Sequence, residues 1–260
     1  MSITLTETEF EVAWEVLRLG DLPLIFRVCV NRHGLTERER SRVIEEAMDG
    51  LRRRWLAGAR GVSAELADAL TLMANPRWAV DARLDVGGPV RAYGAGGRGD
   101  SAVLAALGGG RVVITTTSRY MLAAEVASLA GDLVPGPGRS INLPVEVLLA
   151  ASQRCGGDSH VLGDELIERG VAVNDARTIA RLNEEMLGSG QFGVEAADQD
   201  GALRRAPRVV GFCDSPQGRW AQLRTIGADG QQWITFTPAR LTQLSAMISD
   251  LLMESGVRAA

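Results

Sequence analysis

The stretch SINLPVEVLLAAS, at residues 140–152, repeats part of the opening of the chain, SITLTETEFEVAW, at residues 2–14. Three residues of the opening recur in order: Ser2, Ile3 and Leu5 as Ser140, Ile141 and Leu143. A match of three residues can arise by chance in a chain of 260 residues. A prediction of two similar halves therefore depends on whether the same order of helices and strands occurs twice in the rest of the chain.

The first half reads as helices, then short strands, then one helix. Thr6 with Glu9, and Thr36 with Glu39, have the spacing of a capping box, so helices are expected to begin there. The first helix is expected to end at Gly20, since glycine adopts the left-handed conformation easily. A shorter helix is expected near 62–73, four strands at WAVDARLDV (78–86), VRAY (90–93), SAVLAAL (101–107) and RVVITTTS (111–118), and a helix at 121–131. The alternation in WAVDARLDV predicts a half-buried strand, and the glycine-rich turns predict an antiparallel meander.

The second half repeats this order. Helices are expected at 145–153, 160–169 and 175–187, strands at QFGVEAAD (191–198), RVVGFCD (208–214), WAQLRTI (220–226) and QQWITFT (231–237), and a last helix at 239–253. The offset between matching residues falls from 138 (Ser2 to Ser140) to 120 (Ile114 to Ile234), so the first half carries a longer helical region.

We therefore predict an α+β fold, a single domain over 1–260 with a quasi-twofold internal duplication. The first pseudo-repeat is 1–139 and the second is 140–260. Because neither half has enough strands and helices to bury both faces of its own sheet, the two sheets are expected to join. The result is one central antiparallel sheet with a helical bundle at each end.

The charge and hydropathy of the chain exclude several classes of protein. With 28 basic and 32 acidic residues and a net charge of −4, the chain lacks the basic excess expected of a nucleic-acid-binding protein. No apolar run reaches the roughly 18 residues of a membrane-spanning helix. The acidic N-terminus lacks the basic-then-apolar order of a signal peptide. A cytoplasmic protein without membrane insertion is expected.

The residues that carry chemistry form no catalytic set. All 28 basic residues are Arg, which excludes a P-loop lysine and a Schiff-base lysine. The sequence Cys213–Pro216 is interpreted as a surface turn rather than a nucleophile, because neither His33 nor His160 has a recognisable partner. Three widely spaced cysteines, Cys29, Cys155 and Cys213, are expected to be buried small apolar residues, without a metal or other cofactor.

GAGGRG, at Gly94–Gly99, fits the G-x-G-x-x-G fingerprint of dinucleotide-binding proteins and follows a predicted strand. Three observations count against it. The next element, SAVLAAL, is too short for the required helix, the strand after it ends in Thr and Ser without an acidic residue, and the matching stretch of the second half, GFCDSPQG, lacks the glycines. A hairpin loop explains both GAGGRG in the first half and GFCDSPQG in the second. A nucleotide-dependent enzyme using this loop is kept as the alternative function.

Several motifs, in this order along nearly the whole chain, resemble those of the EspG family, which serves type VII secretion in actinobacteria. They are Glu9-Phe10, Trp14, Leu19-Gly20-Asp21-Leu22-Pro23, Gly97-Arg98, Gly136-Pro137-Gly138-Arg139-Ser140, Thr237-Pro238 and Arg240-Leu241. The resemblance implies a central antiparallel sheet, two helical bundles and a quasi-twofold axis. It also implies a cytosolic chaperone, not an enzyme, which keeps the apolar tip of a PPE subunit soluble and directs PE–PPE heterodimers to their secretion system.

Family members bind cargo through a loop between the second and third strands of the first half and through the C-terminal bundle. Transferred to this chain, the loop is Gly94, Ala95, Gly96, Gly97, Arg98, Gly99, Asp100 and Ser101, with Arg98 and Asp100 as the polar contacts. In the bundle, the resemblance indicates the region of Leu166, Arg169 and Asn174. Self-association in the absence of cargo is also expected, and an architectural protein that self-associates through its sheet edges is a third hypothesis.

Overall fold

One sheet of eleven strands forms the centre of the computed structural model, which describes residues 2–27, 36–59 and 61–257. Its strands are β1 (Ser2–Thr6), β4 (Trp78–Asp85), β5 (Pro89–Gly96), β6 (Ser101–Gly108), β7 (Arg111–Ser118), β8 (Ile141–Pro144), β9 (Gly188–Ala197), β10 (Leu203–Arg205), β11 (Val210–Ser215), β12 (Gly218–Ile226) and β13 (Gln232–Pro238). All pairs of neighbouring strands in it are antiparallel. The predicted α+β class and the single central antiparallel sheet are confirmed.

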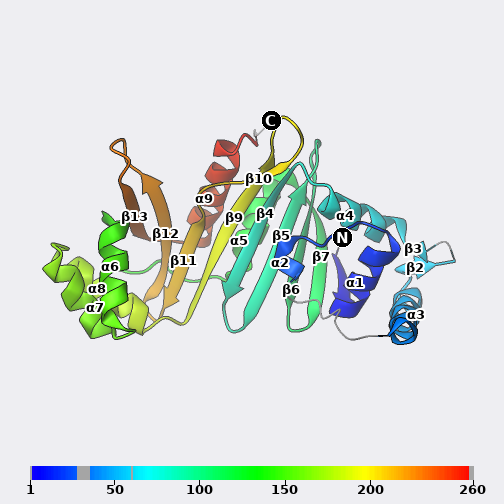
Figure 1. Cartoon of the computed structure of the whole chain (residues 1–260), viewed down its shortest axis with the longest axis horizontal. Coiled ribbons are helices and arrows are strands. Elements are labelled where there is room, and N and C mark those ends of the chain that lie inside the picture. Colours follow the sequence, from blue (N-terminus) through cyan, green and yellow to red (C-terminus); the bar gives the residue numbers. More distant parts are fainter. Residues whose placement is uncertain (1, 28–35, 60, 258–260) are drawn as a thin grey trace.

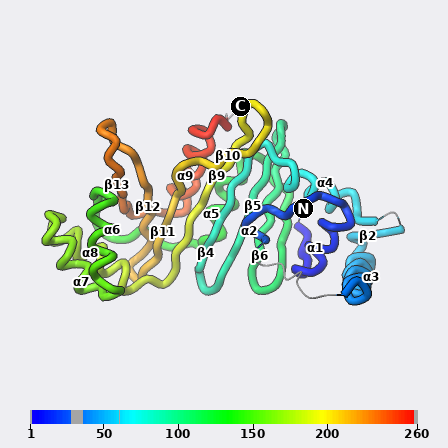
Figure 2. Tube along the Cα trace, in the orientation of Figure 1, coloured from blue at the N-terminus to red at the C-terminus, as the bar shows by residue number. Residues whose placement is uncertain are grey.

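The strand order has the same pattern from both ends: β1-β7-β6-β5-β4 meets β9-β11-β12-β13-β8, with β10 beside β9. In each half a short strand at the sheet edge pairs with the last strand of a meander, as Ile3 does with Ile114 and Ile141 with Phe236. The halves join where Val80 of β4 lies opposite Val194 of β9. Figure 2 shows the first half of the chain on one side of the molecule and the second half on the other.

The helices form a bundle at each end of the sheet and a pair on its far face (Figure 1). The N-terminal bundle contains α1 (Glu7–Val16), α2 (Leu24–Arg27), α3 (Glu37–Arg53) and α4 (Ala64–Ala74), beside the small sheet of β2 (Ala57–Gly58) and β3 (Gly61–Val62). The C-terminal bundle contains α6 (Val145–Cys155), α7 (Ser159–Glu168) and α8 (Val173–Glu184). The far-face pair is α5 (Arg119–Ser128) and α9 (Leu241–Glu254). This arrangement confirms the predicted layer with a bundle at each end.

The two helix starts predicted from capping boxes are correct, but the first helix ends differently. Thr6 and Glu9 form the capping box, with Thr6 N donating to Glu9 Oε2 at 2.8 Å and Glu9 N to Thr6 Oγ1 at 3.1 Å. The same pattern at Thr36 begins α3. Helix α1 ends at Val16, and the residue in the left-handed conformation after it is Arg18, with φ 53°, before Gly20 is reached. Leu19 N donates to Trp14 O there, which completes a Schellman-type ending.

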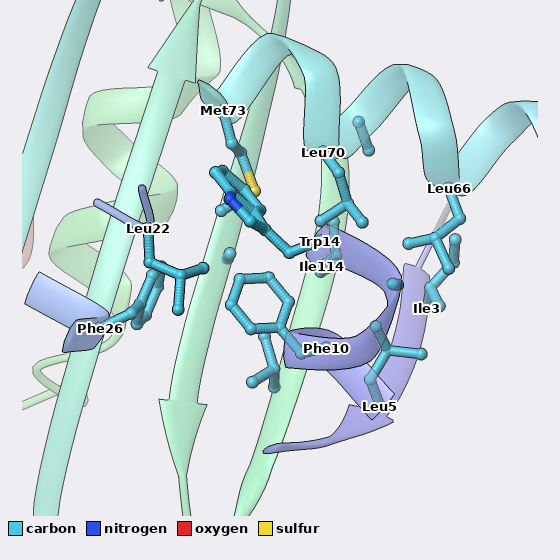
Figure 3. Packing of buried hydrophobic residues seen from close by; sticks show 14 of the residues in the cluster. Ile3, Leu5, Phe10, Trp14, Leu22, Phe26, Leu66, Leu70, Met73 and Ile114 are labelled. Atoms are coloured by element: carbon cyan, nitrogen blue, oxygen red, sulfur yellow. The ribbon is translucent and has the colours of Figure 1, made fainter. Parts of the chain in front are cut away.

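The N-terminal bundle packs on the near face of the first half through a cluster of aromatic and aliphatic side chains (Figure 3). The rings of Phe10 and Trp14 have centroids 5.9 Å apart, and Phe26 meets Phe10 edge-on at 5.5 Å. Ile3 and Leu5 of β1 join the same cluster, so the residues of the repeated stretch are core residues of an edge strand. Neither β1 nor β8 was expected from the sequence, and nor was β10.

Strand β4 corrects the expectation of a half-buried strand. Val80 and Leu84 pack on the far face with α5 and α9, whereas Ala79 belongs to the N-terminal cluster on the near face. Asp81, also on the near face, is only 4% exposed. Because both faces of the sheet centre are covered, Asp81 is buried as well, whereas Arg83 is half-buried and Asp85, at the end of the strand, is exposed.

The sequence Cys213–Pro216 is also corrected, because Cys213, Asp214 and Ser215 are buried at the end of β11 rather than exposed in a turn. Asp214 accepts two hydrogen bonds from Arg219, Nε to Oδ1 and Nη2 to Oδ2, both at 2.7 Å. Arg219 is 0% exposed, and its guanidinium also donates to Ala130 O at 2.6 Å and to Gly131 O at 2.9 Å. One buried side chain thus binds the connector between the halves, residues 129–140 between α5 and β8, to the second half.

Candidate interaction surface

The glycine-rich stretch forms a tighter hairpin than the sequence suggested. Gly94, Ala95 and Gly96 are buried in β5, and Ser101 is the first residue of β6. The turn consists of Gly97, Arg98, Gly99 and Asp100, of which the last three are exposed. The predicted cargo loop of Gly94–Ser101 is therefore corrected to a four-residue turn with Ser101 exposed beside it.

Packing explains the two glycines within β5. A Cβ on Gly94 would lie 2.8 Å from Leu122 Cδ1, and a Cβ on Gly96 would lie 2.0 Å from Cζ2 of the Trp78 ring. Glycine is needed at these positions because helix α5 and the indole ring lie directly on the strand.

The same geometry overturns the dinucleotide fingerprint. GAGGRG runs from a strand through a turn into the antiparallel strand β6, so the glycines do not open a helix that follows them in the chain. A pyrophosphate site of this kind needs that helix, whose N–H groups and dipole bind the phosphates. The nucleotide-dependent alternative therefore has no structural support.

The turn between β5 and β6 lies against the start of α5. Arg119 N donates to Asp100 O at 2.8 Å, and the Tyr120 hydroxyl approaches Asp100 Oδ1 at 3.5 Å. Tyr120 is 57% exposed and Met121 is 53% exposed. We define the turn patch as Arg98, Asp100, Tyr120 and Met121: one charge of each sign beside two large apolar side chains. Sequence reasoning missed Tyr120 and Met121, because only the fold places them beside the turn.

The three bundle residues differ in what they can offer to a partner. Leu166 is 0% exposed and belongs to the core of the bundle, so the expectation that it contacts cargo is corrected to a structural role. Arg169 ends α7 and forms an ion pair with Glu165 of its own helix. Asn174 is exposed at the start of α8, next to Val173, which is 44% exposed. We define Arg169, Val173 and Asn174 as the bundle patch.

The two patches belong to different halves of the sheet. Four strands, β4, β9, β11 and β12, separate β5 from β13 in the sheet. Strand β5 leads into the turn patch, and β13 borders the C-terminal bundle. Five strand spacings correspond to about 24 Å. A partner that contacts both patches must extend over the centre of the sheet, so the pair suits a protein partner better than a small ligand.

The remaining candidate groups have no chemical role that the structure supports. Burial raises the pKa of the Cys213 thiol to about 11, so it stays protonated and is a poor nucleophile at neutral pH. Cys155 is partly exposed and its Sγ donates to Ser152 O, His160 is exposed, and Cys29 and His33 lie outside the described residues. Within the described ranges, no group of acidic, His or Cys side chains could hold a metal ion, and no helix is long and apolar enough to span a membrane.

A single antiparallel sheet with two helical bundles is also the fold of a class of type VII secretion chaperones. One solved structure, that of "the Mycobacterium tuberculosis type VII secretion system chaperone EspG5 in complex with PE25-PPE41 dimer", aligns with a TM-score of 0.76 and 17% identity. The alignment covers 97% of this chain and 96% of that chain. No curated protein sequence matches the chain.

The EspG family model matches residues 6–250, and the chain therefore belongs to the EspG family. This is a family of non-enzymatic chaperones of type VII secretion. The match contains both bundles, the turn patch and the connector between the halves. The resemblance seen in the sequence motifs is confirmed.

Proposed function

We propose that this chain is a type VII secretion chaperone that binds a PE–PPE-like heterodimer at the tip of the PPE subunit. It keeps the cargo soluble and directs it to its secretion system. The observation that carries the proposal is the family match over residues 6–250. The solved complex of EspG5 with the PE25–PPE41 dimer supports it, since that chaperone has the same fold.

The cargo contacts we propose are the turn patch and the bundle patch. The turn patch combines the exposed apolar side chains of Tyr120 and Met121 with Arg98 and Asp100. Apolar anchors in such a surface supply affinity, and the charged pair sets the register and excludes wrong partners. Leu166 supports the bundle patch from inside, because it packs in the core of the C-terminal bundle.

We also propose that the chain is a single domain formed by duplication, with pseudo-repeats at 1–139 and 140–260. The matching strand order of the two halves and the two edge strands at the repeated stretches support this. The longer N-terminal bundle then makes the halves unequal, as a scaffold for one cargo requires. We further propose that the protein acts in the cytoplasm and that, until cargo binds, a second copy of the chain contacts its exposed Met121 and Val173.

Co-expression tests the proposed function. The chain is produced with a PE–PPE pair encoded near its own gene, and the complex is isolated by gel filtration. A stable three-protein complex is expected. If no PE–PPE pair of the same genome co-purifies with the chain, the function is wrong.

Reversing a charge in the turn patch is expected to weaken cargo binding. Arg98→Glu or Asp100→Arg should raise the dissociation constant about tenfold, equivalent to about 1.4 kcal/mol, because each places a like charge against the partner's complementary group. Calorimetry with the purified PE–PPE pair measures the effect. The control is Arg53→Glu, which makes the same charge change on an exposed site in the N-terminal bundle. Equal affinities for Arg98→Glu and the control would remove the turn patch from the interface.

A further inference from the structure

A second site lies on the near face of the sheet, where Leu24 and Ile25 of α2 contribute to its lining. There Tyr93 of β5, Asp81 of β4 and Gly193 of β9 are cross-strand partners in one row. A cavity of about 200 Å³ lies between this row and the segment from Asp21 to Ile25. It belongs to neither the turn patch nor the bundle patch.

The floor of the cavity is charged but electrically balanced. Arg205 of β10 binds Asp81 through two hydrogen bonds, of 2.5 and 3.2 Å, and lies 3.4 Å from Glu195. Arg83 also approaches Asp81, at 3.4 Å. The two guanidinium groups therefore offset the two carboxylates. Gly193 makes this pairing possible, because a Cβ there would lie 2.2 Å from Arg205 Nη2.

Tyr93 supplies an unused polar group. The residue is 5% exposed and lines the cavity, and its hydroxyl makes no hydrogen bond within the described residues and is not sealed off from solvent. Burial raises the pKa of the Tyr93 phenol, and the nearby carboxylates of Glu195 and Asp81 raise it further. The hydroxyl thus keeps its proton and can donate to a ligand. A hydroxyl that no protein group binds is available to a ligand, and a group that accepts its hydrogen bond inside the cavity gains affinity.

The remaining walls are apolar except for Asp21, whose carboxylate is paired with Arg27. They come from Pro23 and Ile25 at α2 and from Met73, Ala74 and Pro76 at the end of α4. An apolar cavity of about 150 Å³ suffices to bind benzene, so one aromatic ring fits here. A charged ligand would lose its hydration without finding a free counter-charge, since the floor is already balanced.

We propose that this cavity binds one neutral, ring-sized group that carries a single hydrogen-bonding function, a phenol or a carboxamide. The ring lies against the apolar walls, and its polar atom accepts the hydrogen bond of Tyr93. Such a group can belong to a free small molecule or to a side chain of a bound protein.

The test uses the chaperone alone, so its outcome does not depend on cargo binding. Met73 lines the cavity, and its methyl group is observed by NMR after assignment with Met73→Leu. Phenol and benzamide are expected to bind and to shift the Met73 methyl signal. The charged probes benzoate and benzylamine are expected to bind at least several-fold more weakly. Tyr93→Phe keeps the ring and removes the hydroxyl, and should weaken phenol binding roughly three- to tenfold.

A second variant, Ala74→Leu, adds bulk at the wall and should abolish the shift without removing any polar group. The proposal is overturned if no probe shifts the Met73 signal, if charged probes bind as tightly as phenol, or if Tyr93→Phe binds phenol as the parent chain does. A final arm repeats the titration with the PE–PPE pair bound. Loss of the phenol response assigns the site to a side chain of the cargo, and an unchanged response assigns it to a free small molecule.

Discussion

Replacing Arg219 by methionine is expected to lower the free energy of unfolding by about 3–5 kcal/mol, the usual cost of removing one partner of a buried ion pair. Arg219 is 0% exposed and its guanidinium lies 4.7 Å from the centroid of the Phe212 ring. The substitution leaves the Asp214 carboxylate buried without its cation, and it leaves Ala130 O and Gly131 O without their guanidinium donor. Urea denaturation of both proteins measures the difference.

Arg139→Met is the matched control. Arg139 also makes two hydrogen bonds to one carboxylate, Asp175 at 2.9 and 3.0 Å, but its side chain is 73% exposed. Exposed pairs contribute about 0–1 kcal/mol, so this variant should remain close to the parent chain. In a double-mutant cycle, adding Asp214→Leu to Arg219→Met should recover part of the loss, because the unpaired buried charge is removed. Equal stabilities of Arg219→Met and the control would contradict the role of the pair.

The sequence predicted the parts of the fold whose causes are local. Capping boxes at Thr6 and Thr36 and the glycine-rich turns of the meander depend on residues a few positions apart. The union of the two sheets followed from a global argument, that each half alone leaves a face uncovered. β1 was missed because its pairing, Ile3 with Ile114, depends on a strand more than a hundred residues away.

The errors at Asp214 and in the turn patch have a similar origin. The composition of Cys213–Pro216 favours a turn, and a turn does follow Ser215, but the burial of Asp214 depends on Arg219 across the hairpin. Likewise, Tyr120 comes next to Asp100 only because the start of α5 is bound to the β5–β6 turn. In both cases the sequence located the segment correctly and could not show which surfaces the tertiary packing would cover.

The second large effect is expected at Gly96. Gly96→Ala should lower the free energy of unfolding by about 2–3 kcal/mol, because the added methyl group overlaps Cζ2 and Cε2 of Trp78, at 2.0 and 2.1 Å. Trp78 is 4% exposed and packs in the far-face core with Leu122 and Val126, so the ring has little room to move. Thermal and urea unfolding, followed by circular dichroism, measure the change.

Gly99→Ala provides the control from the same glycine-rich stretch. It adds the same methyl group where nothing lies within 4 Å, so its stability should equal that of the parent or exceed it by up to about 1 kcal/mol. The double variant Gly96→Ala with Trp78→Leu should lose less than the sum of the single losses, since the smaller side chain makes room for the methyl group. Additive losses, or a Gly96→Ala protein as stable as Gly99→Ala, would contradict the packing explanation. Because a phosphate-binding glycine would alter ligand binding without a large loss of stability, this comparison also separates the two explanations of GAGGRG by experiment.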